Sequence, residues 1–197
     1  MQNKVEKFRI VKFHELKQKI RSCKKCGLWK TRNHALPGEG NISAKLMMIA
    51  QAPGYNEDLE GRMFIGPSGK KFNDLLKEAD ILRRKIFINN VLRCKLPGNR
   101  RPQTSEIKAC TPYLDREIEL IDPAIIATLG FYAARYAFEK YSIEDELEFP
   151  AGCGNIFQVK DKKIFPLRHP AAMLYDTTIH GEMAGNYRKL RRLLDSV

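Results

Sequence analysis

Four short apolar runs are the feature that most restricts how this chain can fold. They are KLMMIA at 45–50, KIFINNVL at 85–92, AIIATLG at 124–130 and KIFPLR at 163–168. Each run has the length and the apolar content of a buried strand, and amphipathic helical patterns separate the runs. This alternation indicates a mainly parallel sheet with helices on both faces. We therefore predict an α/β fold of three layers, α/β/α, around a central, mainly parallel four-stranded sheet.

The remaining pattern completes the expected order of elements. Helices are expected at 68–79, from an N-cap at Thr104 onward, at 131–141 and at 186–196. NIFQV at 155–159 is expected to pair with the last strand as a hairpin. Hydrophobic residues make up 43% of the chain, which is enough for a buried core. We expect one domain over residues 1–197, with residues 1–22 as a helical lead-in.

Polar residues follow the predicted strands where those strands end. The first strand runs into a tight turn at 51–54, the second carries Asn89 and Asn90, and the last is followed by His169. Ligands of parallel sheets bind beyond the carboxyl ends of the strands. Neighbouring residues of a strand point to opposite faces, so only one of the two asparagines can enter a pocket there. The sequence thus predicts a site that combines a turn, an amide and an imidazole.

Four of the five cysteines fall into two groups that suggest one shared ligand. Cys23 and Cys26 form a tight pair in SCKKC, and Cys94 and Cys110 bracket a loop rich in proline, glycine and arginine. The spacing favours a 4Fe–4S cluster, whose irons each take one thiolate, over a zinc site, which usually uses two tight pairs. Unligated buried cysteines are the remaining alternative. Cys153 stands apart and is expected to fill a turn or pack against the sheet.

The chain carries a strong positive charge. Lysine and arginine number 35 against 23 acidic residues, which gives a net charge of +12. A basic domain attracts polyanions, so nucleic acid is the first candidate partner, and a basic surface kept for solubility is the alternative. The charged N-terminal segment has no apolar signal core, and no apolar run approaches ~18 residues, so we expect a cytoplasmic protein with no membrane partner.

Four motifs in one order resemble a known family. They are the early CxxC, the run SAKLMMIAQAPGYNEDLEGRMFIGPSG, the segment NNVLRCKLPGNRRP with EIKAC after it, and RHPAAMLY. Together they resemble the family 4 uracil-DNA glycosylases, the thermostable iron–sulfur type, over roughly residues 20–195. The resemblance implies a uracil-DNA glycosylase-like fold. It also implies a 4Fe–4S cluster on Cys23, Cys26, Cys94 and Cys110.

The resemblance also implies an activity. Members of this family are DNA repair enzymes that flip uracil out of DNA and hydrolyse its N-glycosidic bond, which leaves an abasic site. The expected substrate is uracil in single-stranded DNA or in a U·G duplex. A monomer is the expected form, and a sliding clamp is a candidate protein partner. Arg100 and Arg101, held by the cluster, are expected to meet DNA phosphates.

The resemblance assigns roles to four pocket residues. His169 would donate a hydrogen bond to uracil O2 as negative charge develops there. The amide of Asn90 would pair with O4 and N3–H, a pattern that cytosine reverses. Phe64 would stack on the flipped base, and Glu57 would crowd the 5-position and exclude the methyl group of thymine.

Backbone and loop residues complete the expected site. Gly54 fits a turn where the backbone approaches the base, and the N–H groups around Gln51 and Ala52 are expected to bind uracil O2. After the histidine, Met173 or Leu174 would wedge into the duplex and fill the space left by the flipped base.

The first motif departs from the family pattern. The family usually reads GEAPG or GEGPG, and here the glutamate is replaced by Gln51. Gln51 is still the second candidate catalytic residue, but it supplies no carboxylate to orient water or to offset the sugar cation. The departure leaves an alternative open, namely a weak or inactive iron–sulfur relative that recognises uracil or abasic DNA without turnover.

Overall fold

A single twisted sheet forms the centre of the computed structural model, which describes residues 2–197. The strands lie in the order β1-β3-β2-β4-β6-β5. The four central strands are parallel: β3 (Phe87–Asn90), β2 (Leu46–Ala50), β4 (Ile125–Leu129) and β6 (Lys162–Leu167). Two short antiparallel edge strands, β1 (Glu39–Gly40) and β5 (Phe157–Val159), extend the expected four strands to six. The predicted hairpin of β5 with β6 is confirmed.

The expected helices are confirmed, but two of them start at other residues than predicted, and one short helix, Tyr55–Glu60, was not expected. They are α1 (Gln2–Arg21), α2 (Tyr55–Glu60), α3 (Pro67–Glu78), α4 (Thr104–Ile121), α5 (Phe131–Tyr141) and α6 (His180–Asp195). The N-cap of α4 is Gln103 and not Thr104, because the Glu106 carboxylate accepts the Gln103 N–H at 2.8 Å in a capping box. Helix α6 begins at His180, before the expected 186, since its first turns include two glycines that weaken the pattern.

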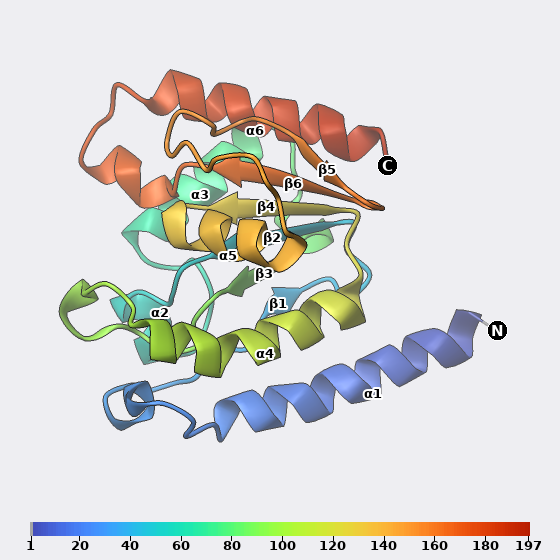
Figure 1. Cartoon of the computed structure of the whole chain (residues 1–197), viewed down its shortest axis with the longest axis vertical. Helices are drawn as coiled ribbons and strands as arrows, with labels where there is room; N and C mark the ends of the chain where they lie inside the picture. Colours follow the sequence, from blue (N-terminus) through green and yellow to red (C-terminus); the bar gives the residue numbers. More distant parts are fainter. Residues whose placement is uncertain (1) are drawn as a thin grey trace.

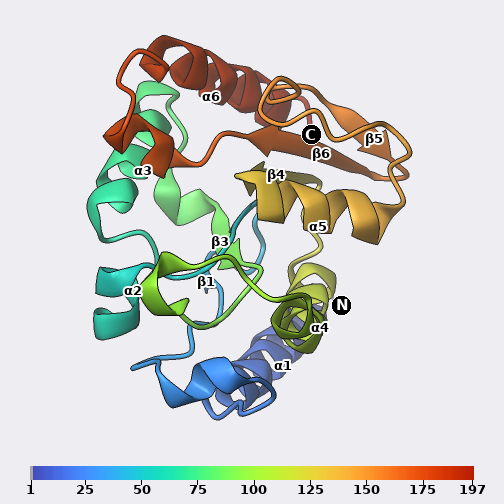
Figure 2. The same ribbon diagram turned by 60° about the vertical axis from the view of Figure 1, so that its left-hand side comes forward.

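Helices cover both faces of the sheet, as predicted. Helices α1, α4 and α5 lie on one face, and α3 and α6 lie on the other (Figure 1, and turned in Figure 2). Side chains alternate along the strands accordingly: in β2, Met47 and Ile49 join the first core and Leu46 and Met48 the second. All of β2 is buried, which explains why its sequence is apolar throughout.

Among the helices described, none combines the length and the apolar character needed to cross a bilayer.

A buried ion pair lies under the carboxyl end of β3. Arg93 Nη2 and Glu117 Oε2 are 2.5 Å apart, with side chains 1% and 0% exposed. The same carboxylate accepts hydrogen bonds from Asn89 Nδ2 at 2.7 Å and from the Gly38 N–H at 2.8 Å. It therefore ties α4, the end of β3 and the segment before β1 to one charge.

We predict that Glu117→Ala lowers the free energy of unfolding by about 3–5 kcal/mol, because it leaves the Arg93 guanidinium buried without its anion. Urea denaturation measures the change. The matched control is Glu119→Ala on the same helix, whose pair with Arg116 lies on the surface and contributes less than about 1 kcal/mol. Equal effects of the two substitutions would contradict the importance of the buried pair.

Candidate active site

A pocket of about 560 Å³ opens at the carboxyl edge of the sheet. Its wall includes most of the residues singled out in the sequence: Gln51, Ala52, Gly54, Glu57, Phe64, Asn90, His169 and Leu174. Gln51 follows β2, Asn90 ends β3 and His169 follows β6, so the order of the parallel strands brings them together. The geometry thus gathers in one place the turn, the amide and the imidazole that the strand ends predict.

His169 is held as a neutral hydrogen-bond donor. It is the N-cap of the short 3₁₀ helix η4 (Pro170–Leu174), where its Nδ1 accepts the Ala171 N–H at 3.1 Å. The ring proton of the neutral imidazole is therefore on Nε2, which remains available to the pocket. Burial lowers the pKa of His169 from 6.5 to about 4, and the nearby Glu57 carboxylate opposes this shift only in part. The imidazole can donate a hydrogen bond at neutral pH without a positive charge.

Asn90 presents an amide whose hydrogen bonds are incomplete. The residue is 2% exposed, its Oδ1 has no hydrogen-bond partner among the described residues, and its Nδ2 contacts only the Met63 sulfur, at 3.1 Å. A buried amide oxygen without a partner is costly, and a thioether is a weak acceptor. Asn89 points to the other face, toward Glu117, as expected for its neighbour in the strand. Asn90 is thus the amide that is free to bind a polar ligand.

Glu57, in α2, is the one acidic residue among those that line this pocket. Its Oε1 accepts the N–H groups of Ile65 and Gly66, at 2.9 and 2.8 Å, just before α3. Its Oε2 lies against Gly54, where an added Cβ would come within 2.5 Å. A larger residue at 54 would therefore displace this carboxylate from the turn.

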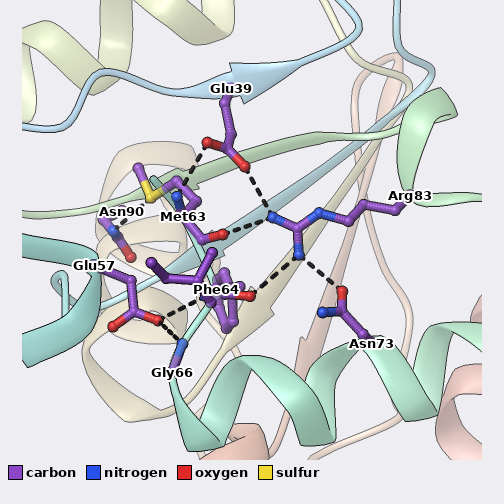
Figure 3. A network of polar contacts seen from close by, with 9 residues as sticks. Glu39, Glu57, Met63, Phe64, Gly66, Asn73, Arg83 and Asn90 are labelled. Carbon is purple, nitrogen blue, oxygen red and sulfur yellow. Dashed lines mark hydrogen bonds and ion pairs between the residues drawn. The ribbon is translucent and has the colours of Figure 1, made fainter. Parts of the chain in front are cut away.

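Phe64 forms an aromatic wall of the pocket. Its ring lies 6.1 Å from the His169 ring, with an angle of 25° between the planes, and 4.3 Å from the Phe72 ring behind it. Its backbone has φ 51°, a left-handed conformation that is unfavourable for a bulky residue. Figure 3 shows the polar network around this segment. Sequence reasoning did not identify Glu39 and Arg83 in this network, because neither has a distinguishing sequence pattern.

The residues expected at the DNA surface differ in exposure. Met173 is 5% exposed and packs in the core, whereas Leu174 is 43% and the adjacent Tyr175 91% exposed. Arg100 is paired with Glu106 at 2.6 Å, and Arg101 is exposed. Neither arginine lines the pocket. Sequence reasoning gave Tyr175 no role, although it ends the RHPAAMLY motif and follows the expected wedge directly.

A second, smaller cavity brings the four paired cysteines together. It is lined by Cys23, Cys26, Cys94 and Cys110, with Lys25, Arg32, Arg93 and Ala109. Cys153 is not part of this lining. Two segments far apart in the sequence therefore meet at one thiol-rich site, which the cysteine grouping predicts.

The charges around this cavity suit an anionic group. Arg32 Nη1 donates to Cys94 Sγ at 3.1 Å, and the Arg93 N–H donates to Cys110 Sγ at 3.3 Å. Arg93 Nη2 is paired with Glu117, and the buried Nε and Nη1 have no hydrogen-bond partner within the part of the chain that the structure describes. In that same part, no three His, Cys, Asp or Glu side chains are close enough to hold a single metal ion. Four thiolates spaced around a wider, negatively charged cluster would fit this arrangement and would use the free Arg93 donors.

Comparison with known proteins is consistent with this geometry. Residues 37–191 match the family model of the uracil DNA glycosylase superfamily. The chain is 42% identical over 183 residues to a type-4 uracil-DNA glycosylase of Sulfurisphaera tokodaii, covering 91% of this chain and 83% of that protein. It is 42% identical over 182 residues to the type-4 enzyme of Saccharolobus solfataricus (90% and 84% covered). It is 35% identical over 186 residues to that of Archaeoglobus fulgidus (91% and 92%).

We predict that His169 is neutral and protonated on Nε2 at pH 6, and that it takes a second proton near pH 4. Imidazole ¹⁵N chemical shifts measure both properties, and an imidazolium at pH 6 would contradict the prediction. The unfolded chain binds this proton below pH 6.5 and the folded chain only near pH 4. The free energy of unfolding should therefore fall as the pH drops between these values, by at most about 1.4 kcal/mol per pH unit from this group.

Proposed function

The chain belongs to the uracil-DNA glycosylase superfamily, and from that membership we propose that it is a DNA repair enzyme that excises uracil from DNA. It hydrolyses the N-glycosidic bond of a flipped nucleotide and leaves an abasic site. The observation that carries this function is the convergence of His169, Asn90 and Phe64 on one pocket, in a chain closely similar to type-4 uracil-DNA glycosylases. All of these residues come from one chain, so a monomer has a complete pocket.

Recognition of uracil rests on Asn90. Its free Oδ1 accepts the N3–H of uracil, and its Nδ2 exchanges the weak contact with the Met63 sulfur for uracil O4. Cytosine has an acceptor at N3 and a donor at C4, so it would leave both amide groups facing like groups in a buried site. Phe64 stacks on the face of the base, and Glu57 occupies the space that a methyl group at the 5-position needs.

Bond cleavage rests on His169. The C1′–N1 bond breaks with its electron pair going to uracil, which leaves as an anion, and the sugar becomes cationic. The Nε2–H of neutral His169 donates to uracil O2, where the negative charge increases. One such preorganised donor contributes on the order of 2.7–4 kcal/mol in other enzymes. Water then adds its oxygen to C1′, and the proton that it loses neutralises the uracil anion, which balances the hydrolysis.

The surface around the pocket suits a DNA strand. Leu174 and Tyr175 project next to the pocket and supply the apolar tip that enters the space of the flipped nucleotide. Arg101, which makes no ion pair among the described residues, is the arginine of the pair that contacts a phosphate. Arg100 is a support for the loop through Glu106.

The four cysteines hold a 4Fe–4S cluster in this proposal. The cluster supplies a covalent link between the segment after α1 and the two ends of the 94–110 region, and no step of the reaction needs its electrons. Arg32 and Arg93 offset its negative charge. The support is the thiol set around one cavity together with the Nε and Nη1 donors of Arg93, which have no partner among the described residues.

We predict that His169→Ala lowers kcat on a single-stranded uracil oligonucleotide by about 10²–10³-fold, because it removes the donor to O2. Cleavage of the abasic product by alkali measures the rate. The control is His14→Ala, an exposed residue of α1, which should leave the rate unchanged. If the unmodified protein releases no uracil from any DNA, the proposed function is wrong.

We predict that Cys94→Ala abolishes the visible absorbance of an iron–sulfur cluster and lowers bound iron, because one of four thiolates is lost. Cys153→Ala should leave both unchanged, since Cys153 does not line the cavity. Bound zinc in place of iron in the unmodified protein would contradict the cluster assignment and leave the glycosylase assignment standing.

A further inference from the structure

Two charged residues outside the pocket bind the backbone beside Phe64, the aromatic wall of the pocket. Arg83, in the 3₁₀ helix η2 (Arg83–Lys85), and Glu39, in β1, pair at 2.8 Å (Figure 3). Neither side chain lines the pocket, and each is about a third exposed. A surface pair of this kind usually contributes little to stability. Here, however, both partners also bind the main chain next to Phe64.

The contacts fix the peptide groups on both sides of Met63. Glu39 Oε2 accepts the Met63 N–H at 3.0 Å, and Arg83 Nη2 donates to the Met63 carbonyl at 2.6 Å. Arg83 Nη1 donates to Asn73 Oδ1 at 2.8 Å and lies 3.5 Å from the Phe64 carbonyl. The planar guanidinium thus reaches an acid, an amide and two backbone carbonyls at once, which a lysine cannot do.

These contacts hold a backbone conformation of Phe64 that is unfavourable by itself. Phe64 has φ 51°, and a non-glycine residue keeps such a conformation only where its surroundings over-determine it. On the far side, Glu57 fixes the N–H groups of Ile65 and Gly66. Gly69 lets α3 approach, because an added Cβ there would lie 2.2 Å from the Phe64 carbonyl group. The segment 63–66 is therefore held at both ends, by Glu57 from inside the pocket and by the Glu39–Arg83 pair from outside.

We propose that Glu39 and Arg83 are positioning residues that hold Phe64 and Met63 in place for base binding. The inference rests on the proposed function, since it concerns the stacking surface for uracil. A fixed ring loses little conformational entropy when the base stacks on it, whereas a mobile ring would have to be ordered at each binding event. The Met63 sulfur, which rests on the Asn90 amide, is positioned by the same two peptide contacts.

The test compares Arg83→Met and Glu39→Gln with the control Arg84→Met, an exposed neighbour that makes no contact in this network among the described residues. Arg83→Met keeps the side-chain length and removes the donors. Glu39→Gln keeps the shape but leaves one of the two donors, Arg83 or the Met63 N–H, without an acceptor. Two ligands distinguish a loss of base stacking from a general loss of binding. The first is free uracil, as a competitive inhibitor, and the second is an oligonucleotide with a tetrahydrofuran abasic analogue, which has no base to stack.

Both variants should bind free uracil about three- to tenfold more weakly, the loss expected for one misplaced aromatic contact. Their affinity for the abasic oligonucleotide should stay within about twofold of the control, since the phosphate contacts are untouched. The double variant should be little worse than either single variant, because both act on the same peptide groups. Arg83→Lys, which keeps the charge but not the fork, should resemble Arg83→Met.

Unchanged uracil inhibition in the variants, or an equal loss of affinity for the abasic oligonucleotide, would overturn the inference. If Arg83→Met does not fold, Glu39→Gln and Arg83→Lys decide the question by the same two measurements. A wild-type protein that excises uracil while its variants match the control disproves only the positioning role. A wild-type protein that excises nothing disproves the proposed function instead.

Discussion

The buried pair of Arg93 and Glu117 connects the two parts of the molecule that matter for function. Arg93 faces the cysteine-lined cavity, and Glu117 accepts a hydrogen bond from Asn89. Asn89 Oδ1 in turn accepts the N–H of Asn90 at 2.8 Å. Such a pair persists in a dry interior only if each charge finds further partners, because desolvation opposes it. Glu117 has such partners at the end of β3 and before β1, and the proposed cluster would supply those of Arg93. Asn90, the amide proposed to read the base, is therefore positioned by the network that borders the thiols.

The sheet was largely predictable because burial on both faces leaves a direct mark on the sequence. All four parallel strands are apolar runs, and the α5 boundaries follow from a clean helical period. The edge strands left weaker marks: β1 has two residues, too few for any periodicity. The start of α4 was misplaced by one residue, because a glutamine cap is recognisable only through its reciprocal bond with Glu106. The local sequence pattern thus predicted the central strands and helices, whereas tertiary contacts determine where the elements begin and end.

The site residues also fall into those that the sequence could predict and those that it could not. The positions of His169 and Asn90 could be predicted from the topology, because parallel strands end at the same edge of the sheet and the residues at their ends lie there. Phe64 looked like an ordinary core phenylalanine and was identified only through a family motif. Glu39 and Arg83 had no signal at all, because in the sequence a lone acid and an arginine in a basic segment resemble any solvated surface. Their role depends on distances between segments far apart in the sequence, which no local window contains.

The glutamine at position 51 is consistent with the electrostatics of the pocket. A leaving uracil anion is stabilised by donors and opposed by nearby negative charge, and the pocket already contains the Glu57 carboxylate. Two backbone N–H groups bind one oxygen of that carboxylate, so part of its charge is offset. A second carboxylate at 51 would favour the imidazolium form of His169 and would face the departing anion. Gln51 lines the same wall with a neutral amide, which can bind water without adding charge. The sugar cation must then draw its stabilisation from the phosphates of the substrate and from the uracil anion itself.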